Sequence, residues 1–117
     1  MRTHVMDGRV FVSTAVTKDG APFALVPGSR VKLDFTRPGK LRLSADCNIL
    51  GGDVDVSDGR ITVSVMGMTL KGCSEELTAQ DEWLAAVLTA RPFWELSGPR
   101  LRISTDEVAI EFTEDVA

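Results

Sequence analysis

Most of this chain alternates between apolar and polar residues with a period of two. Val31, Leu33 and Phe35 are separated by Lys32 and Asp34, so that the two kinds of residue face opposite ways in an extended chain. This pattern is typical of half-buried strands in an antiparallel sheet. It recurs in residues 41–45, 54–56, 61–65, 101–103 and 108–112.

Turn-forming residues separate the alternating segments. Asp58-Gly59 lies between two of them and predicts a tight hairpin, because glycine adopts positive φ without penalty. Residues 36–40, Thr-Arg-Pro-Gly-Lys, suit a slightly longer hairpin.

One segment breaks the alternation and has the spacing of an amphipathic helix. Residues 75–90 can begin at a cap formed by Ser74 or Thr78, and Pro92 follows their end. The apolar face of this helix must pack on the sheet. That face contains Leu77, Leu84, Val87 and Leu88, with Trp83 at its edge.

These elements predict an α+β fold. The sheet is expected to be strongly curved and antiparallel, or an incomplete β-barrel, with about seven to eight strands and one helix packed against it. The length of 117 residues predicts a single domain over residues 1–117 with a core of its own.

Charge and hydropathy narrow the range of partners. The net charge of −4 and the scattered lysines and arginines argue against nucleic-acid binding. No apolar run approaches the roughly 18–20 residues of a membrane helix. The first residues do not resemble a signal peptide, so the protein is expected to be cytoplasmic if Met1 is its native start.

Two cysteine-containing segments carry a resemblance to a known family. Residues 41–56, LRLSADCNILGGDVDV, resemble the first signature of the META domain family, also called HslJ-like. Residues 66–73, MGMTLKGC, resemble the second signature. The helix sequence QDEWL and the closing hairpin that begins with FWEL fit the same order, so the resemblance runs from about residue 8 to residue 112. One departure is Asp46, which stands where the family often has a glycine before the cysteine.

The resemblance implies a small β-rich domain without an established enzymatic activity. Members are bacterial heat-inducible envelope proteins and lipoproteins, so it implies a structural, binding or stress-response role at the cell envelope, or a secreted protein. The family-motif residues that it points to are Asn48, Gly51, Gly52, Met68 and Thr69.

Cys47 and Cys73 are the only cysteines, and each lies in one of the two signature segments. The two intervening strands can return the chain close to its starting point, which would allow a disulfide. Two buried thiols that pack as small apolar groups are the alternative, and a reactive thiol is a third. For Asn48, Gly51 and Gly52 we expect a conformationally demanding strand connection, against the alternative of a ligand-contacting loop.

An apolar ligand is the first candidate for a binding partner, and an unknown protein is the second. Methionines suit adaptable apolar pockets, so a cavity between helix and sheet would make the domain a carrier of a lipid or other small apolar ligand. Ordinary core packing is the alternative for the same residues, which are Met66, Met68, Trp83 and Leu84. If Trp94 is partly exposed, it is the residue expected to contact a partner. We expect a monomer.

Catalytic and metal-binding patterns are weak. His4, the only histidine, stands near the chain start without an evident nucleophile, so we expect no enzymatic activity. Residues 53–64 lack the glutamate that ends a calcium loop, and we expect neither a metal nor a cofactor. The acidic helix residues are expected mostly to face solvent near the helix N-terminus. They are Glu75, Glu76, Asp81 and Glu82.

Overall fold

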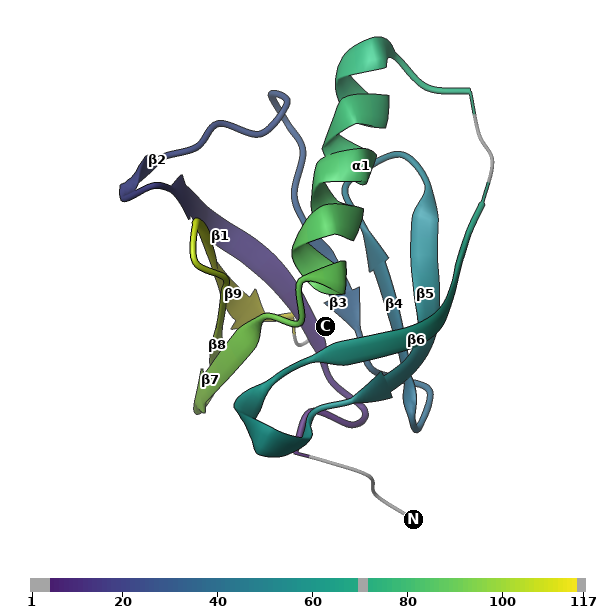
Figure 1. Cartoon of the computed structure of the whole chain (residues 1–117), viewed down its shortest axis with the longest axis vertical. Helices are drawn as coiled ribbons and strands as arrows, with labels where there is room; N and C mark the ends of the chain where they lie inside the picture. The colour runs from purple at the N-terminus through teal and green to yellow at the C-terminus, as the bar shows by residue number, and fades with distance from the viewer. Residues whose placement is uncertain (1–4, 70–71, 116–117) are drawn as a thin grey trace.

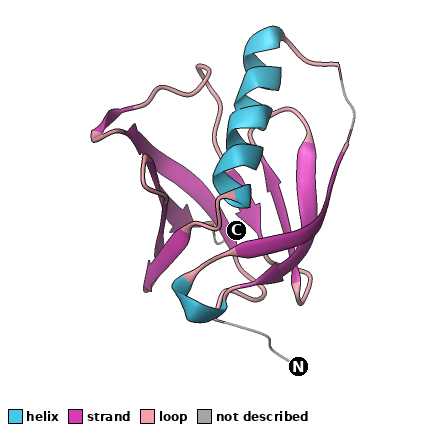
Figure 2. Ribbon diagram, viewed as in Figure 1, coloured by secondary structure: helices cyan, strands magenta, loops and turns pink. Residues whose placement is uncertain are grey.

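The protein folds as a curled antiparallel sheet with one helix, α1, laid across its inner side (Figures 1 and 2). A computed structural model describes residues 5–69 and 72–115 of the chain. Eight of the strands in this part form a continuous path in the order β6-β5-β4-β3-β1-β9-β8-β7, and the short β2 pairs with β1. The strands are β1 Val10–Lys18, β2 Ala21–Pro22, β3 Lys32–Asp34, β4 Lys40–Ser44, β5 Ile49–Asp55, β6 Thr62–Met68, β7 Phe93–Ser97, β8 Arg100–Ser104 and β9 Val108–Glu114. The predicted α+β class and incomplete barrel are confirmed.

The apolar positions of the alternating segments form the core, as the period of two predicts. Antiparallel pairing sets Leu33 opposite Leu43 and Leu43 opposite Leu50, so successive strands place apolar side chains on the same face. Residues of the other half of the sheet complete the same cluster. These include Phe11, Leu101, Ile103, Ile110 and Phe112, all at most 1% exposed.

The two edge strands of the curled sheet, β6 and β7, approach each other at one end only. Arg60, just before β6, forms an isolated bridge with Phe93 of β7, and the Ile61 amide donates to the Pro92 carbonyl oxygen at 2.8 Å. The Trp94 indole nitrogen adds a bond of 2.9 Å to the Val56 carbonyl oxygen. We call these contacts the β6–β7 seam. They close one end of the half-barrel and leave the remainder of both edges unpaired with each other.

Helix α1, Glu75–Thr89, covers the core from the open side of the sheet. It begins at Ser74, whose hydroxyl oxygen accepts a hydrogen bond from the Leu77 amide at 3.2 Å. Leu84, Val87 and Leu88 are buried in the core cluster, as their spacing predicted.

The expectation for the helix acids needs one correction. Glu75, Glu76 and Glu82 are exposed, but Asp81 is only 3% exposed. Asp81 lies on the flank of the apolar face, where it meets polar groups from the sheet rather than solvent. Gln80, beside it, is 7% exposed for the same reason.

Two strand connections also differ from the sequence prediction. Asp58-Gly59 does turn the chain, but inside a short 3-10 turn, η1 Ser57–Gly59, so the β5–β6 connection is longer than a tight hairpin. Asp58 takes the positive φ of 60° there. Gly51 and Gly52 lie inside β5 rather than before it, and the β5–β6 register shifts between Gly51 and Asp53. The glycines therefore accompany a bulge, which lets the strand bend.

No helix in the described part of the chain is both long and apolar enough to cross a bilayer.

Candidate functional site

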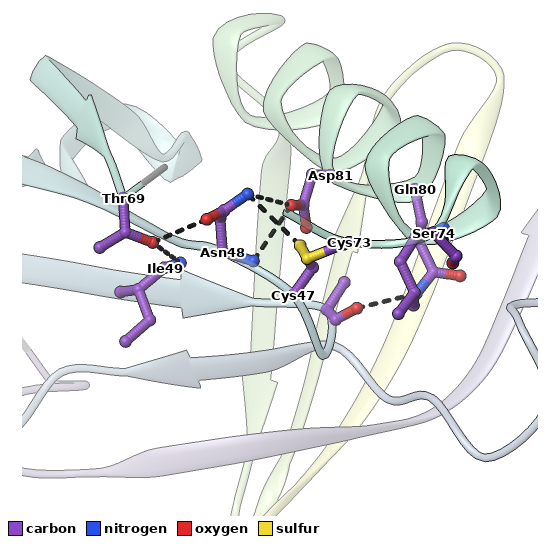
Figure 3. The surroundings of a disulfide bond; sticks show 10 residues. Cys47, Asn48, Ile49, Thr69, Cys73, Ser74, Gln80 and Asp81 are labelled. Carbon is purple, nitrogen blue, oxygen red and sulfur yellow. Dashed lines mark hydrogen bonds between the residues drawn. A yellow bond between two sulfur atoms is a disulfide. The ribbon is translucent and has the colours of Figure 1, made fainter. Parts of the chain in front are cut away.

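The two META-like segments meet at a disulfide beside the start of α1 (Figure 3). Cys47, between β4 and β5, is joined to Cys73, just before the helix, and their Cα atoms are 6.2 Å apart. The bond links residues 26 positions apart and ties the β4–β5 connection to the segment that leads into α1. The sequence left open a disulfide, two buried thiols or a reactive thiol, and the structure contains the disulfide.

Asn48 is the centre of a polar network around this disulfide. Its backbone amide and its side-chain Nδ2 both donate to Oδ2 of Asp81, at 3.1 and 3.2 Å. The same Nδ2 lies 3.3 Å from the Cys47 sulfur, and the side-chain oxygen accepts from the Thr69 hydroxyl at 3.0 Å. Asn48 is only 8% exposed, so these bonds replace water that the amide group has lost.

Thr69 connects this network to the sheet. Its hydroxyl oxygen accepts from the Ile49 amide at 2.9 Å, while its own amide donates to the Ile49 carbonyl oxygen at 3.0 Å. The side chain thus supplies a pairing bond just beyond the end of β6. We call Cys47, Asn48, Thr69, Cys73 and Asp81 the signature cluster.

Gln80, in the preceding position on α1, makes a second link from the helix to the sheet. Its Nε2 donates to the Ala45 carbonyl oxygen at 3.0 Å, and its Oε1 accepts from the Val26 amide at 2.8 Å. Sequence reasoning missed Gln80 and Asp81 as structural residues. Gln80 precedes Leu84 by one helical turn, so its position on the buried face was the available signal.

The backbone conformation of Asp46 shows why the family often has glycine at this position. Its φ is 68°, in the left-handed region where glycine has no steric cost. Aspartate tolerates this region better than most residues. The Asp46 carboxylate also accepts from the Arg30 amide at 2.9 Å, which ties the loop before β3 to this turn.

Gly51 is needed for close strand contact. A Cβ atom at this position would lie 2.7 Å from the Leu41 carbonyl oxygen of β4, nearer than real Cβ atoms approach. The position therefore belongs to the sheet and not to a ligand-contacting loop.

The arrangement of the signature cluster suits a structural role. Both sulfurs are in the disulfide, so neither cysteine offers a thiolate. Asp81 keeps one oxygen, Oδ1, buried without a hydrogen-bond partner among the described residues. Those residues also contain no group of three His, Cys, Asp or Glu side chains placed to hold a metal ion. His4 lies outside the described residues.

The residues predicted to line a ligand cavity are dispersed. Leu84 is fully buried in the core, and Met68 is 49% exposed on the β6 edge. Met66 lies in β6, but its side chain is outside the described part of the chain. Trp94 is half-buried, and its indole belongs to the β6–β7 seam. Of the residues expected to line a cavity between helix and sheet, Met68 and Leu84 do not share one, and Met66 stays untested; for Trp94 the sequence predicted only contact with a partner.

Trp83 borders a different cavity, at the C-terminal end of α1. This pocket is open to solvent and has a volume of about 380 Å³. We call it the helix-end pocket. Val87 and Ala90 continue the wall that Trp83 begins on the helix, and the remaining walls come from β7, the β8–β9 turn and the end of β1. Phe23 stacks on Trp83, with ring centroids 5.2 Å apart.

The fold and the signature cluster define a small α+β half-barrel tied by one disulfide. The chain belongs to the META domain family, whose profile matches residues 5–117, and this confirms the resemblance noted in the sequence. No match was found among proteins with curated descriptions.

Solved structures show the same fold. An NMR structure of a protein from Burkholderia xenovorans is similar with a TM-score of 0.77 at 20% identity, covering 98% of this chain and 87% of the other. The crystal structure of a DUF4847 family protein from Bacteroides vulgatus is similar with a TM-score of 0.61 at 14% identity, covering 93% and 94%. At these identities the likeness concerns the fold alone.

Proposed function

We propose that this META domain is a non-enzymatic binding module that works in an oxidising compartment such as the bacterial cell envelope. The observation that carries the proposal is the Cys47–Cys73 disulfide at the centre of the family signatures. Structural disulfides persist in envelope and secreted proteins, whereas cytosolic thiols are kept reduced.

The surroundings of the disulfide support a structural rather than a catalytic use of the signature residues. The side-chain amide of Asn48 forms its hydrogen bonds with Asp81, Thr69 and the Cys47 sulfur. Asp81 in turn accepts two bonds from Asn48 and is nearly inaccessible to solvent. These groups hold the helix to the sheet, and the surface of the domain is left for binding.

A thiol count tests the compartment. Protein isolated from its native cells is denatured without reductant, alkylated with iodoacetamide and weighed by mass spectrometry. We expect no alkylated cysteine, and a sample reduced first should carry two labels, one for each of Cys47 and Cys73. Two labels without prior reduction would contradict the proposal.

A carrier role for a small apolar ligand is the second candidate. The helix-end pocket favours it, because its volume of about 380 Å³ falls within the usual range for ligand pockets. It lies between the C-terminal part of α1 and the strands β7, β8, β9 and β1, and its lining includes Trp83 but not Met68 or Leu84.

A further inference from the structure

We propose that the helix-end pocket binds a small amphipathic carboxylate, whose apolar body lies against Trp83 and Phe93 and whose anionic end is held by Arg60 and Arg91. This inference rests on the carrier role just described and adds the charge and orientation of the ligand. It does not depend on the compartment in which the disulfide forms.

The apolar body has a preformed place. Trp83, Val87 and Ala90 follow one face of α1, at the spacing that puts them side by side along the helix. Phe93 lines the pocket from the start of β7 and remains 47% exposed, so part of its ring surface is accessible to a ligand. A ligand between these walls would remove aromatic surface from water, and this favours binding.

The anionic end has two guanidinium groups available on one side of the pocket. Arg60 lies over the Phe93 ring, 4.1 Å from its centroid, and its Nη1 donates to the Arg91 carbonyl oxygen at 3.3 Å. Arg91 donates through Nε to the Thr62 hydroxyl oxygen at 3.2 Å. Both side chains are thus positioned by neutral partners.

Neither arginine is in an ion pair among the described residues. The two terminal nitrogens of Arg91 make no hydrogen bond within that same part of the chain. These nitrogens can bind a carboxylate in the bidentate manner that guanidinium groups favour. A carboxylate bound at both guanidinium groups would gain a favourable Coulomb interaction with each of them.

The backbone at Arg91 is strained, and strained residues are common at functional sites. Arg91 follows the C-cap Ala90 and has a φ of 54°, at the position where helices most often end with glycine. An arginine there accepts backbone strain that glycine would avoid. The strained conformation directs the chain from α1 into β7, directly beside the pocket.

The far rim of the pocket gives the ligand its orientation. Asp106 and Glu107, in the β8–β9 turn, line the pocket together with Lys18. Lys18 offsets one of the two carboxylates and leaves this rim with a formal charge of −1, against +2 for Arg60 and Arg91, so the charged end of the ligand is expected at the arginine side.

Three probes with eight carbon atoms each test the charge: octanoate and octylammonium below their micelle concentrations, and octanol below its solubility limit. Binding is followed by isothermal titration calorimetry with the unsubstituted protein, so that the β6–β7 seam beside the pocket stays intact. We expect saturable binding of octanoate, at least about tenfold weaker binding of octanol, and none of octylammonium, because a charge-assisted hydrogen bond contributes enough for such a ratio.

Two variants of Arg91 separate charge from backbone effects. Arg91→Gln should weaken octanoate binding about tenfold and leave octanol binding unchanged. Arg37→Gln, in the exposed β3–β4 connection, removes the same charge far from the pocket and should change neither. Arg91→Gly should weaken octanoate binding and also raise the thermal midpoint, because it relieves the positive φ.

Equal affinities for octanoate and octanol, absence of octanoate binding, or an unchanged octanoate affinity in Arg91→Gln would overturn this proposal. Free thiols in the protein from native cells would contradict only the compartment. Failure of all three probes to bind would also remove the support for a carrier role while leaving the disulfide result intact.

Discussion

Gly51 and Gly67 are paired with each other across β5 and β6, yet their surroundings differ. Gly51 lies against the next strand, where an added Cβ would meet the Leu41 carbonyl oxygen at 2.7 Å. At Gly67, on the outer strand of the sheet, an added Cβ would have nothing within 4 Å. Gly51 is therefore constrained by the backbone of β4 and not by Gly67, its cross-strand partner in β6.

We expect Gly51→Ala to lower the free energy of unfolding by about 1–3 kcal/mol, because β4 and β5 must separate to admit the methyl group. Gly67→Ala is the matched control and should leave stability unchanged or raise it by up to about 1 kcal/mol, since it restricts the unfolded chain. Urea denaturation measures both. Equal effects of the two substitutions would show that close strand contact is not the reason for Gly51.

Asp46 provides a second test of a single position. Asp46→Ala should cost about 1–2 kcal/mol, because it combines a positive φ with loss of the bond to the Arg30 amide. Asp46→Gly loses the same bond but relieves the backbone, so we expect its stability to lie within about 0.5 kcal/mol of the parent. Thermal or urea unfolding of the two variants distinguishes them, and a Gly variant as unstable as the Ala variant would refute the account.

Among the elements, the disulfide joins parts that the sheet does not join. Strand β6 ends at Met68, and α1 begins at Glu75. The segment between them contains Thr69 and Cys73 of the signature cluster. The hydrogen bonds from Asn48 to Asp81 add a direct contact between the β4–β5 connection and the helix. Helix position thus depends on the disulfide and on the polar links of Asp81 and Gln80, besides the apolar face of Leu84 and Leu88.

Reduction of the disulfide should lower the free energy of unfolding by about 3–4 kcal/mol, because the denatured chain regains the entropy of a loop that spans 26 residues. Guanidinium denaturation with and without dithiothreitol measures the difference. A Cys47→Ser/Cys73→Ser variant should have the stability of the reduced protein and no further response to reductant. A loss under about 1 kcal/mol would mean that the polar links alone hold α1 in place.

For the molecule as a whole, the β6–β7 seam decides whether the sheet behaves as a half-barrel or as an open sheet. The seam joins segments from the middle and the later part of the chain, and each of its hydrogen bonds is formed by groups that local strand pairing does not use.

Trp94→Phe should lower the free energy of unfolding by about 1–2 kcal/mol, because the Val56 carbonyl oxygen loses its partner. Hydrogen exchange should accelerate at the Ile61 amide, which belongs to the seam, and stay unchanged at the Thr17 amide, which is paired with Ala109 in the β1–β9 ladder. Uniform acceleration at both amides would indicate a global loss of stability instead of local opening of the seam.

Much of this architecture is predictable because it depends on local periodicity. Alternation marks the strands whose inward residues, such as Leu33, Leu43 and Ile103, form the core. The helix boundaries follow from the cap at Ser74 and the spacing of Leu84, Val87 and Leu88. The candidate site is less predictable. Asp81 looks like a solvent-facing helix residue until the fold brings Asn48 against it, and the bonds of Gln80 to Ala45 and Val26 depend on segments distant in the sequence.

The sequence by itself determined the strands, the helix and the family, since hydrophobic period, turn residues and signature motifs are all local properties. Only the tertiary structure decided that Cys47 meets Cys73, that Asp81 is buried, and that Trp83, Phe93 and Arg91 enclose one pocket. These contacts join residues far apart along the chain, and their formation depends on the curl of the sheet and on how the helix crosses it. No local sequence pattern encodes the curl of the sheet or the crossing of the helix, because both result from the packing of the whole core.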